Sequence, residues 1–198
     1  MQFYDVARTQ LTELNGLARL EDPAFRPVEL TGTYSDGERD HKVLSFQPAR
    51  LTIRTGRARI TVTRPDGTVV PDPPSPWPDR VRLAASHPLV RRVVRIMARD
   101  DDLDWYDLYK VHEIIRHDLN AEELGAKGWG NFIEQLGWGS KTEDRAFTVS
   151  ADRFDVSGDA ARHAVPKNAE PPKRTMTIGE GRDYISRMVK RWIDFRAT

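Results

Sequence analysis

The chain has 198 residues, enough for one domain of ordinary size or for one domain with a small companion. Apolar residues make up 38% of it and charged residues 31%, a balance that excludes collagen, coiled-coil rods and wholesale disorder. There is no cysteine, so disulfides, iron–sulfur clusters, thiolate zinc sites and cysteine nucleophiles are excluded. Residues 1–16 do not resemble a signal peptide, and no run of about 18 apolar residues occurs. We therefore expect a cytoplasmic protein that does not contact a membrane.

The charged residues are unevenly distributed along the chain. Residues 49–99 hold 11 basic and 3 acidic residues, a net charge of +8, whereas residues 100–145 hold 5 basic and 12 acidic residues, a net charge of −7. Such segregation can build a cationic surface that attracts a polyanion. Alternatively, the two blocks neutralise each other within the fold or across a dimer.

The region over residues 28–70 is predicted to be a small antiparallel sheet. Apolar residues alternate with polar or basic ones in segments 43–46, 50–55 and 58–64, and this period of two is typical of strands. Asp66-Gly67 has the composition of a tight hairpin turn, and Ser35-Asp36-Gly37 marks another turn. With a short opening helix over residues 3–20, these strands define an N-terminal β-rich region, residues 1–70.

A proline-rich connector follows. Residues 71–79 contain five prolines in nine positions, and proline both removes a backbone donor and disfavours helix in the preceding residue. This stretch is therefore predicted to be extended.

After the connector the apolar residues recur with helical spacing, which predicts a helical bundle over residues 80–198. The last helix has the strongest start signal, because Thr177 and Glu180 have the spacing of a capping box. Trp105, Ile185, Met188 and Trp192 are predicted to be buried together. The fold class expected from the sequence is thus α+β, a β region followed by a helical bundle. The expected helices cover residues 88–99, 104–119, 129–136, 142–152 and the segment that follows Thr177.

Few site motifs are present. The sequence contains no HExxH, GxSxG or phosphate-loop motif, and we expect neither a metal nor a cofactor. The run Asp100–Asp102 with Asp104 could bind a hard cation, but acidic residues are also favoured at a helix start. His112 lies on an apolar helix face with Arg116 one turn further along. It is either a buried, hydrogen-bonded side chain or a proton-transfer group.

Residues 150–176 are the most unusual segment. They include Asp155, Asp159, Arg162 and His163 around Gly158, which interrupts a helical pattern. Arg162 beside His163 combines an anion-binding donor with a titratable group. The alternative is a structural cluster of ion pairs.

Three segments carry a resemblance to a known family: WYDLYKVHEIIRHDL (105–119), GDAARHA (158–164) and TIGEGRDYISRMVKRWI (177–193). Together they resemble a family of uncharacterised bacterial helical proteins with general similarity to the HEPN superfamily, which includes RNA-cleaving toxins and phage-defence proteins. The resemblance implies a HEPN-like bundle and places Arg162 and His163 in the family motif. The HEPN nuclease signature itself, Arg followed by His after four to six residues, is absent ahead of His163. It occurs for Arg80 and Arg82 ahead of His87, outside the expected helices.

The sequence therefore supports two functional hypotheses. The first is an RNA-binding protein of a defence or toxin type, with His163 and Arg162 as candidate catalytic residues for metal-independent cleavage. Arg91, Arg95 and Arg99 form one ridge on a helix and would contact the nucleic acid, and His112, Arg116 and Asp159 are secondary candidates. The second is a non-catalytic module that docks a protein partner or a second copy through its acidic and basic surfaces.

Overall fold

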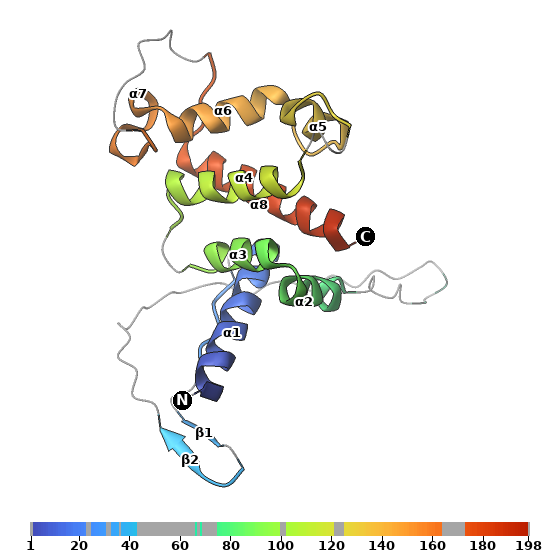
Figure 1. Cartoon of the computed structure of the whole chain (residues 1–198), viewed down its shortest axis with the longest axis vertical. Coiled ribbons are helices and arrows are strands. Elements are labelled where there is room, and N and C mark those ends of the chain that lie inside the picture. Colours follow the sequence, from blue (N-terminus) through green and yellow to red (C-terminus); the bar gives the residue numbers. More distant parts are fainter. Residues whose placement is uncertain are drawn as a thin grey trace. The chain divides into compact units, whose positions relative to one another are not determined.

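In a computed structural model the chain forms two compact units. The larger unit consists of residues 1–28 together with residues 77–198, and the smaller unit of residues 29–76. The structure describes residues 2–22, 25–30, 33–35, 37–42, 66, 68, 75–99, 102–120, 125–163 and 173–197. The larger unit is helical (Figure 1). Its elements are α1 (Gln2–Glu21), α2 (Trp77–Ser86), α3 (Pro88–Met97), α4 (Trp105–Asp118), α5 (Trp129–Gln135), α6 (Lys141–Asp152), α7 (Phe154–Ser157), the 3₁₀ turn η1 (Gly158–Ala160) and α8 (Ile178–Ala197).

The helices of the larger unit share one hydrophobic core. α4 packs against α3, α6 and α8, while α2 packs against α3 and α8, α5 against α6, and α1 against α3. Gly16 allows the close approach of α1, because a Cβ atom there would collide with the backbone of Val94. The predicted burial is confirmed: Trp105, Ile185, Met188 and Trp192 are 4%, 0%, 1% and 0% exposed.

The predicted helices are confirmed to within a few residues at their ends, and their caps explain where they begin. Pro88 occupies the first position of α3, where its missing N–H has no helical partner. At α8, the Thr177 N–H donates to Glu180 Oε2 across 2.7 Å, and the Glu180 N–H donates to Thr177 Oγ1 across 3.3 Å. This reciprocal pair is the predicted capping box.

The predicted α+β fold class is wrong, because the described part of the chain is mostly helical. The opening helix predicted over residues 3–20 is confirmed as α1. In the smaller unit, the described residues include two three-residue strands, β1 (Thr33–Ser35) and β2 (Asp40–Lys42). They pair as an antiparallel hairpin, with Thr33 opposite Lys42, around Gly37 at φ 94°. A two-stranded ribbon of this length has no face that can build a core. The expected strands over 43–46, 50–55 and 58–64 lie outside the described residues.

The predicted end of the proline-rich connector, at residue 79, is wrong. α2 begins at Trp77, inside the segment that was expected to be extended. Pro78 is tolerated there because the first N–H groups of a helix have no intrahelical acceptor. Asp79 adds a favourable negative charge to this first turn. The high proline content therefore led to a wrong prediction at the start of α2.

Candidate functional site

Helix α4 presents an exposed face that combines aromatic and charged side chains. Tyr106, Lys110 and Glu113 are three or four residues apart and so lie on one stripe of the helix. Tyr106 is 55% exposed. The ammonium group of Lys110 lies 4.4 Å from the centre of its ring, within the range of a cation–π contact. This face is therefore an aromatic surface with a positive charge on it.

Arg162 joins this face to the segment that follows α7. Its guanidinium lies 4.5 Å from the centre of the Tyr109 ring, and its Nη1 lies 3.4 Å from Glu113 Oε1. The Arg162 backbone N–H donates to the carbonyl of Ala151 across 2.9 Å. Two of the sequence segments that carried the family resemblance, around Tyr109 and Arg162, thus meet in space. The predicted site residue Asp159 is exposed in η1 nearby in sequence.

His163 stands beside Arg162 and is oriented by a carboxylate. Its Nε2 lies 2.7 Å from Oδ1 of Asp152, the last residue of α6, and the His163 side chain is 50% exposed. Because a carboxylate only accepts, the imidazole Nε2–H donates to it, and in the neutral form of the ring the lone pair is then on Nδ1. A histidine held in one tautomer with a free nitrogen can take up or release a proton. Sequence reasoning found His163 but missed Asp152, which lies eleven positions earlier.

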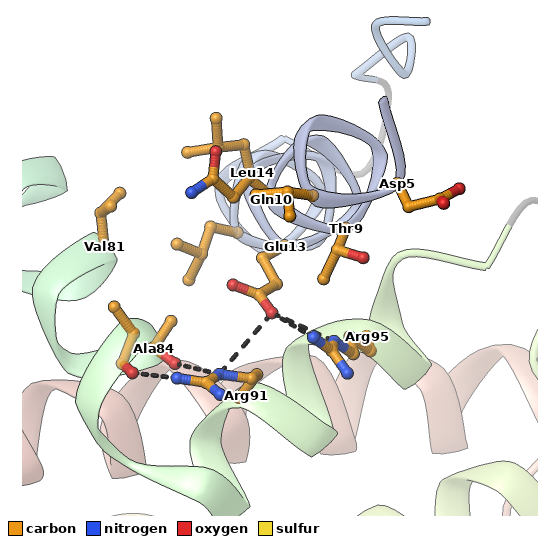
Figure 2. A pocket seen from close by; sticks show the side chains of 12 residues that line it. Asp5, Thr9, Gln10, Glu13, Leu14, Val81, Ala84, Arg91 and Arg95 are labelled. Atoms are coloured by element: carbon orange, nitrogen blue, oxygen red, sulfur yellow. Dashed lines mark hydrogen bonds and ion pairs between the residues drawn. The ribbon is translucent and has the colours of Figure 1, made fainter. Parts of the chain in front are cut away.

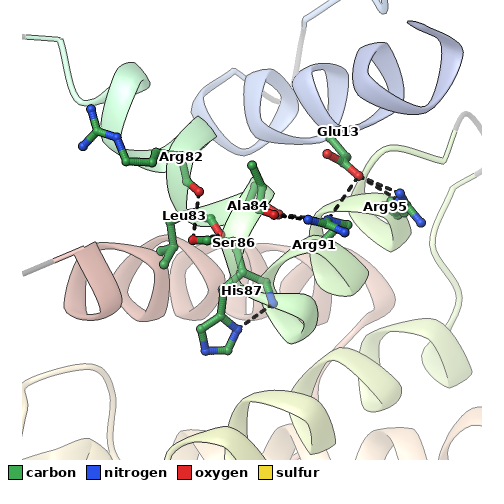
Figure 3. A network of polar contacts seen from close by, with 10 residues as sticks. Glu13, Arg82, Leu83, Ala84, Ser86, His87, Arg91 and Arg95 are labelled. Atoms are coloured by element: carbon green, nitrogen blue, oxygen red, sulfur yellow. Dashed lines mark hydrogen bonds and ion pairs between the residues drawn. The ribbon is translucent and has the colours of Figure 1, made fainter. Parts of the chain in front are cut away.

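The predicted basic ridge on α3 is bound mainly to groups of the protein itself (Figure 3). Arg95 contacts Glu13 of α1 at 2.7 Å and 3.1 Å, and Arg91 lies 3.7 Å from the same carboxylate. Arg91 also donates to the carbonyls of Ala84 and Ala85. These contacts hold α1 and the end of α2 on α3.

The third ridge residue, Arg99, contacts Asp107 of α4 at 2.5 Å. Two other acidic residues of the 100–145 block pair elsewhere, Glu113 with Arg162 and Glu134 with Lys141. The ridge therefore supports the interpretation that the basic block is neutralised partly within the fold.

His112 is fully buried and contacts three core aromatic rings. Its Nε2 donates to Asp144 Oδ1 across 2.7 Å, and the same oxygen accepts from Trp129 Nε1 and Tyr184 Oη at 3.0 Å and 2.9 Å. Burial by itself raises the pKa of Asp144, but the hydrogen bonds and the neighbouring imidazole together hold that pKa below its usual value. Burial, with Asp144 beside it, raises the pKa of the Tyr184 hydroxyl. His112 is therefore buried and hydrogen-bonded, the first of the two alternatives given for it from the sequence.

The remaining candidates have structural contacts as well. Arg116 is exposed, with its guanidinium 5.9 Å from the centre of the Trp129 ring. His87 caps α3, since its Nδ1 accepts from the Val90 N–H, while its Nε2 lies 3.3 Å from Asp118. Its upstream arginines also have partners: Arg80 contacts Glu21 and Asp194, and Arg82 contacts Asp79.

The last residue of the acidic run, Asp104, caps the start of α4. Asp104 accepts from the Asp107 N–H across 2.9 Å at the start of α4. Among the described residues, no three His, Asp or Glu side chains form a group that could hold a metal ion.

None of the described helices has an apolar stretch long enough to cross a lipid bilayer. Comparisons of the chain with protein-family models, with curated proteins and with solved structures found no match.

Proposed function

We propose that the chain binds single-stranded RNA across the exposed face of α4, and that His163 acts there as the acid–base group of a metal-independent cleavage. The observation that carries this proposal is the 2.7 Å contact between His163 Nε2 and Asp152, beside the Arg162 guanidinium. Of the histidines whose side chains are described, His163 combines 50% exposure with an orienting carboxylate and an adjacent arginine. His112 and His87 serve the core and a helix cap instead.

The binding half of the proposal rests on the residue types along α4. Single-stranded RNA is recognised by stacking its bases on aromatic rings or on the planes of arginine side chains, and by pairing its phosphates with cations. Tyr106 offers an exposed ring, Lys110 places a cation on that ring, and Arg162 places a second cation on the ring of Tyr109, three residues further along α4. Glu113 lowers the positive charge of the surface, but it is paired with Arg162.

The chemical half follows from the tautomer that Asp152 imposes. The 2′-hydroxyl oxygen attacks the adjacent phosphorus while its proton passes to His163 Nδ1. The bond from phosphorus to the 5′ oxygen then breaks, and the leaving oxygen takes a proton from water or from the imidazolium. The products are a 2′,3′-cyclic phosphate and a 5′-hydroxyl. Arg162 stabilises the charge that develops on the phosphoryl oxygens.

Binding is tested by fluorescence anisotropy with a labelled 20-nucleotide single-stranded RNA. With two phosphate contacts, one each from Lys110 and Arg162, the slope expected for single strands predicts that affinity falls roughly sevenfold between 50 and 200 mM salt. Tyr106→Ala and Arg162→Gln should each weaken binding several-fold. His117→Ala, at another exposed position of α4, is the matched control and should not. Absence of RNA binding by the wild-type chain at 50 mM salt would refute the proposal.

Cleavage is tested with the same RNA in the presence of EDTA, and with DNA of the same sequence as a substrate that lacks the 2′-hydroxyl. His163→Ala should abolish product formation, and Asp152→Asn should reduce it and displace its pH profile, because the tautomer is no longer fixed. RNA binding that survives without any cleavage, or cleavage that survives His163→Ala, removes the catalytic half of the proposal.

The second hypothesis, a non-catalytic interaction module, is favoured by a different observation. Arg95 and Arg99 are paired with Glu13 and Asp107. These arginines therefore serve in part to hold helices together, and this use of the basic residues favours a protein-binding role for the surface between α1 and α3.

A further inference from the structure

A groove with a volume of about 570 Å³ runs between α1, α2 and α3. It is within the size range of pockets that hold ligands. Figure 2 shows Glu13 pointing from α1 toward Arg91 and Arg95 of α3, with Val81 and Ala84 of α2 at the side. The groove shares no lining residue with the exposed face of α4.

The α1 wall of the groove has an uncovered apolar stripe. Val6 and Leu14 line the groove and are 52% and 39% exposed, and Phe3, one turn before Val6, is 78% exposed. The C-terminal half of the same helix is different, because Leu17 and Leu20 are only 3% and 4% exposed. α1 therefore buries one end of its apolar face in the core and leaves the other end exposed to solvent. An exposed apolar stripe beside a groove is a feature of protein-binding surfaces.

The α3 wall is basic. A smaller hollow of about 280 Å³ adjoins the groove, and the two share Arg91 and Arg95. Arg92 also lines the smaller hollow; it is exposed, and within the part of the chain that the structure describes it makes no ion pair. The side chains of Arg91 and Arg95 are 38% and 45% exposed although both face Glu13. The basic wall thus retains positive charge that an incoming carboxylate can contact.

We propose that this groove is the docking site for an acidic amphipathic helix of a partner protein. Leucine-like side chains on one face of that helix would pack on Val6 and Leu14, and carboxylates on its edge would pair with the arginines of α3. A helix laid into a groove and anchored at every third or fourth residue is a common mode of peptide recognition. The apolar stripe favours a peptide over a nucleic acid, since phosphates and sugars have nothing to pack on it. The basic wall favours an acidic partner over a second α1, whose exposed half carries Arg8 as well as Asp5.

The probe is a fluorescein-labelled, 16-residue helical peptide with leucine at every third or fourth position and glutamate on both sides of that stripe. A matched peptide has lysine in place of each glutamate. Fluorescence anisotropy should give saturable binding of the glutamate peptide and at least tenfold weaker binding of the lysine peptide.

The protein variants separate the two walls of the groove. Leu14→Asp places a charge in the apolar wall and should weaken binding of the glutamate peptide at least fivefold. Arg92→Glu reverses a charge in the basic wall and should weaken that binding by at least as much. Both positions are exposed, so circular dichroism and the Tm should not change. Arg145→Glu, an exposed arginine of α6, is the control and should bind as the wild type does.

Three results would overturn the proposal. The two peptides could bind equally, which would show that the basic wall plays no part. The wild-type chain could sediment as a dimer that Leu14→Asp dissociates, which would make a second copy the occupant. Single-stranded RNA could displace the bound glutamate peptide from the wild-type chain and fail to bind the Arg92→Glu variant. Together these two results would make this surface part of the RNA-binding site instead.

Discussion

Asp144 accepts the Nε2–H of His112 across 2.7 Å, in a position where His112 has no exposed surface. The carboxylate lies on α6 and the imidazole on α4, and Trp129 of α5 and Tyr184 of α8 donate to the same oxygen. One carboxylate therefore satisfies polar groups from three other helices. Among the described residues, the imidazole Nδ1 is the buried side-chain atom left without a hydrogen-bond partner.

Removing that carboxylate should be severely destabilising. Asp144→Ala leaves three buried donors without an acceptor, and we expect a loss of about 3–5 kcal/mol in the free energy of unfolding. Asp144→Asn should lose less, because an amide oxygen can still accept. Urea denaturation monitored by tryptophan fluorescence measures both. Asp183→Ala, an exposed aspartate on α8, is the control, and a similar loss there would contradict the role given to Asp144.

Acid should destabilise the fold through the same residue. The pKa of Asp144 is lower in the folded chain than in the unfolded one, because its hydrogen bonds and the imidazole outweigh the effect of burial. The unfolded state then binds more protons, so this contribution is complete above the unfolded pKa of about 3.9 and is lost as pH falls through the folded pKa. Hydrogen bonds from Thr177 also lower the pKa of Glu180, with the same sign. The free energy of unfolding should therefore decline below about pH 4, and Asp144→Asn should reduce this decline.

Trp192 tests the packing of α8. It is 0% exposed and its indole N–H donates to Asp118 Oδ2 across 2.8 Å. Trp192→Ala should lower the free energy of unfolding by about 3–5 kcal/mol. Trp192→Phe keeps most of the ring and loses the hydrogen bond, so its loss should be smaller. A change below about 1 kcal/mol in Trp192→Ala would be incompatible with a core position.

Two glycines of α8 should respond differently to replacement by alanine. A Cβ atom at Gly181 would lie 2.6 Å and 2.8 Å from the ring of Trp105, whereas one at Gly179 would have its nearest neighbour at 3.9 Å. Gly181→Ala should therefore lower the Tm by an amount that corresponds to about 1–3 kcal/mol of overpacking. Gly179→Ala should leave the Tm unchanged or raise it, because alanine favours helix. Differential scanning calorimetry compares the two, and equal responses would contradict the close contact of Gly181 with Trp105.

The arginine ridge should contribute to stability even if it also binds a ligand. In Arg91→Glu with Arg95→Glu, Glu13 loses two cations and faces two carboxylates. We expect a loss of roughly 1–2 kcal/mol, since exposed pairs each contribute up to about 1 kcal/mol. Thermal unfolding at low and high salt measures this effect, and the difference should shrink in high salt. A Tm equal to that of the wild type would mean that the contacts with Glu13 contribute nothing measurable.

The helices could be predicted because their signals are local. The capping box at Thr177, Pro88 at a helix start and the apolar spacing around Trp192 all act within a few residues. The fold class was mispredicted for the same reason, because a period of two over residues 43–64 does not show that a sheet forms a core. The start of α2 was missed because the prolines around Trp77 dominate the local composition.

Only some residues of the candidate site could be predicted from the sequence. His163 and Arg162 can be noticed in the sequence because the two are adjacent. Asp152 becomes relevant only when the turn after η1 folds back on the end of α6, and Tyr109 only when that turn packs on α4. The ridge shows the same limit, since Glu13 is 82 residues from Arg95. Patterns along a chain indicate which face of a helix is polar, but the partner of a charge depends on tertiary packing.

The final helix has a consequence for the order in which the chain can fold during synthesis. α8 contacts four earlier helices. Lys190 pairs with Glu21 of α1, Asp194 with Arg80 of α2, Trp192 with Asp118 of α4 and Tyr184 with Asp144 of α6. Each of these partners is translated before α8. A nascent chain that ends at residue 176 thus exposes the apolar surfaces that α8 covers, so the core can close only after α8 has been synthesised.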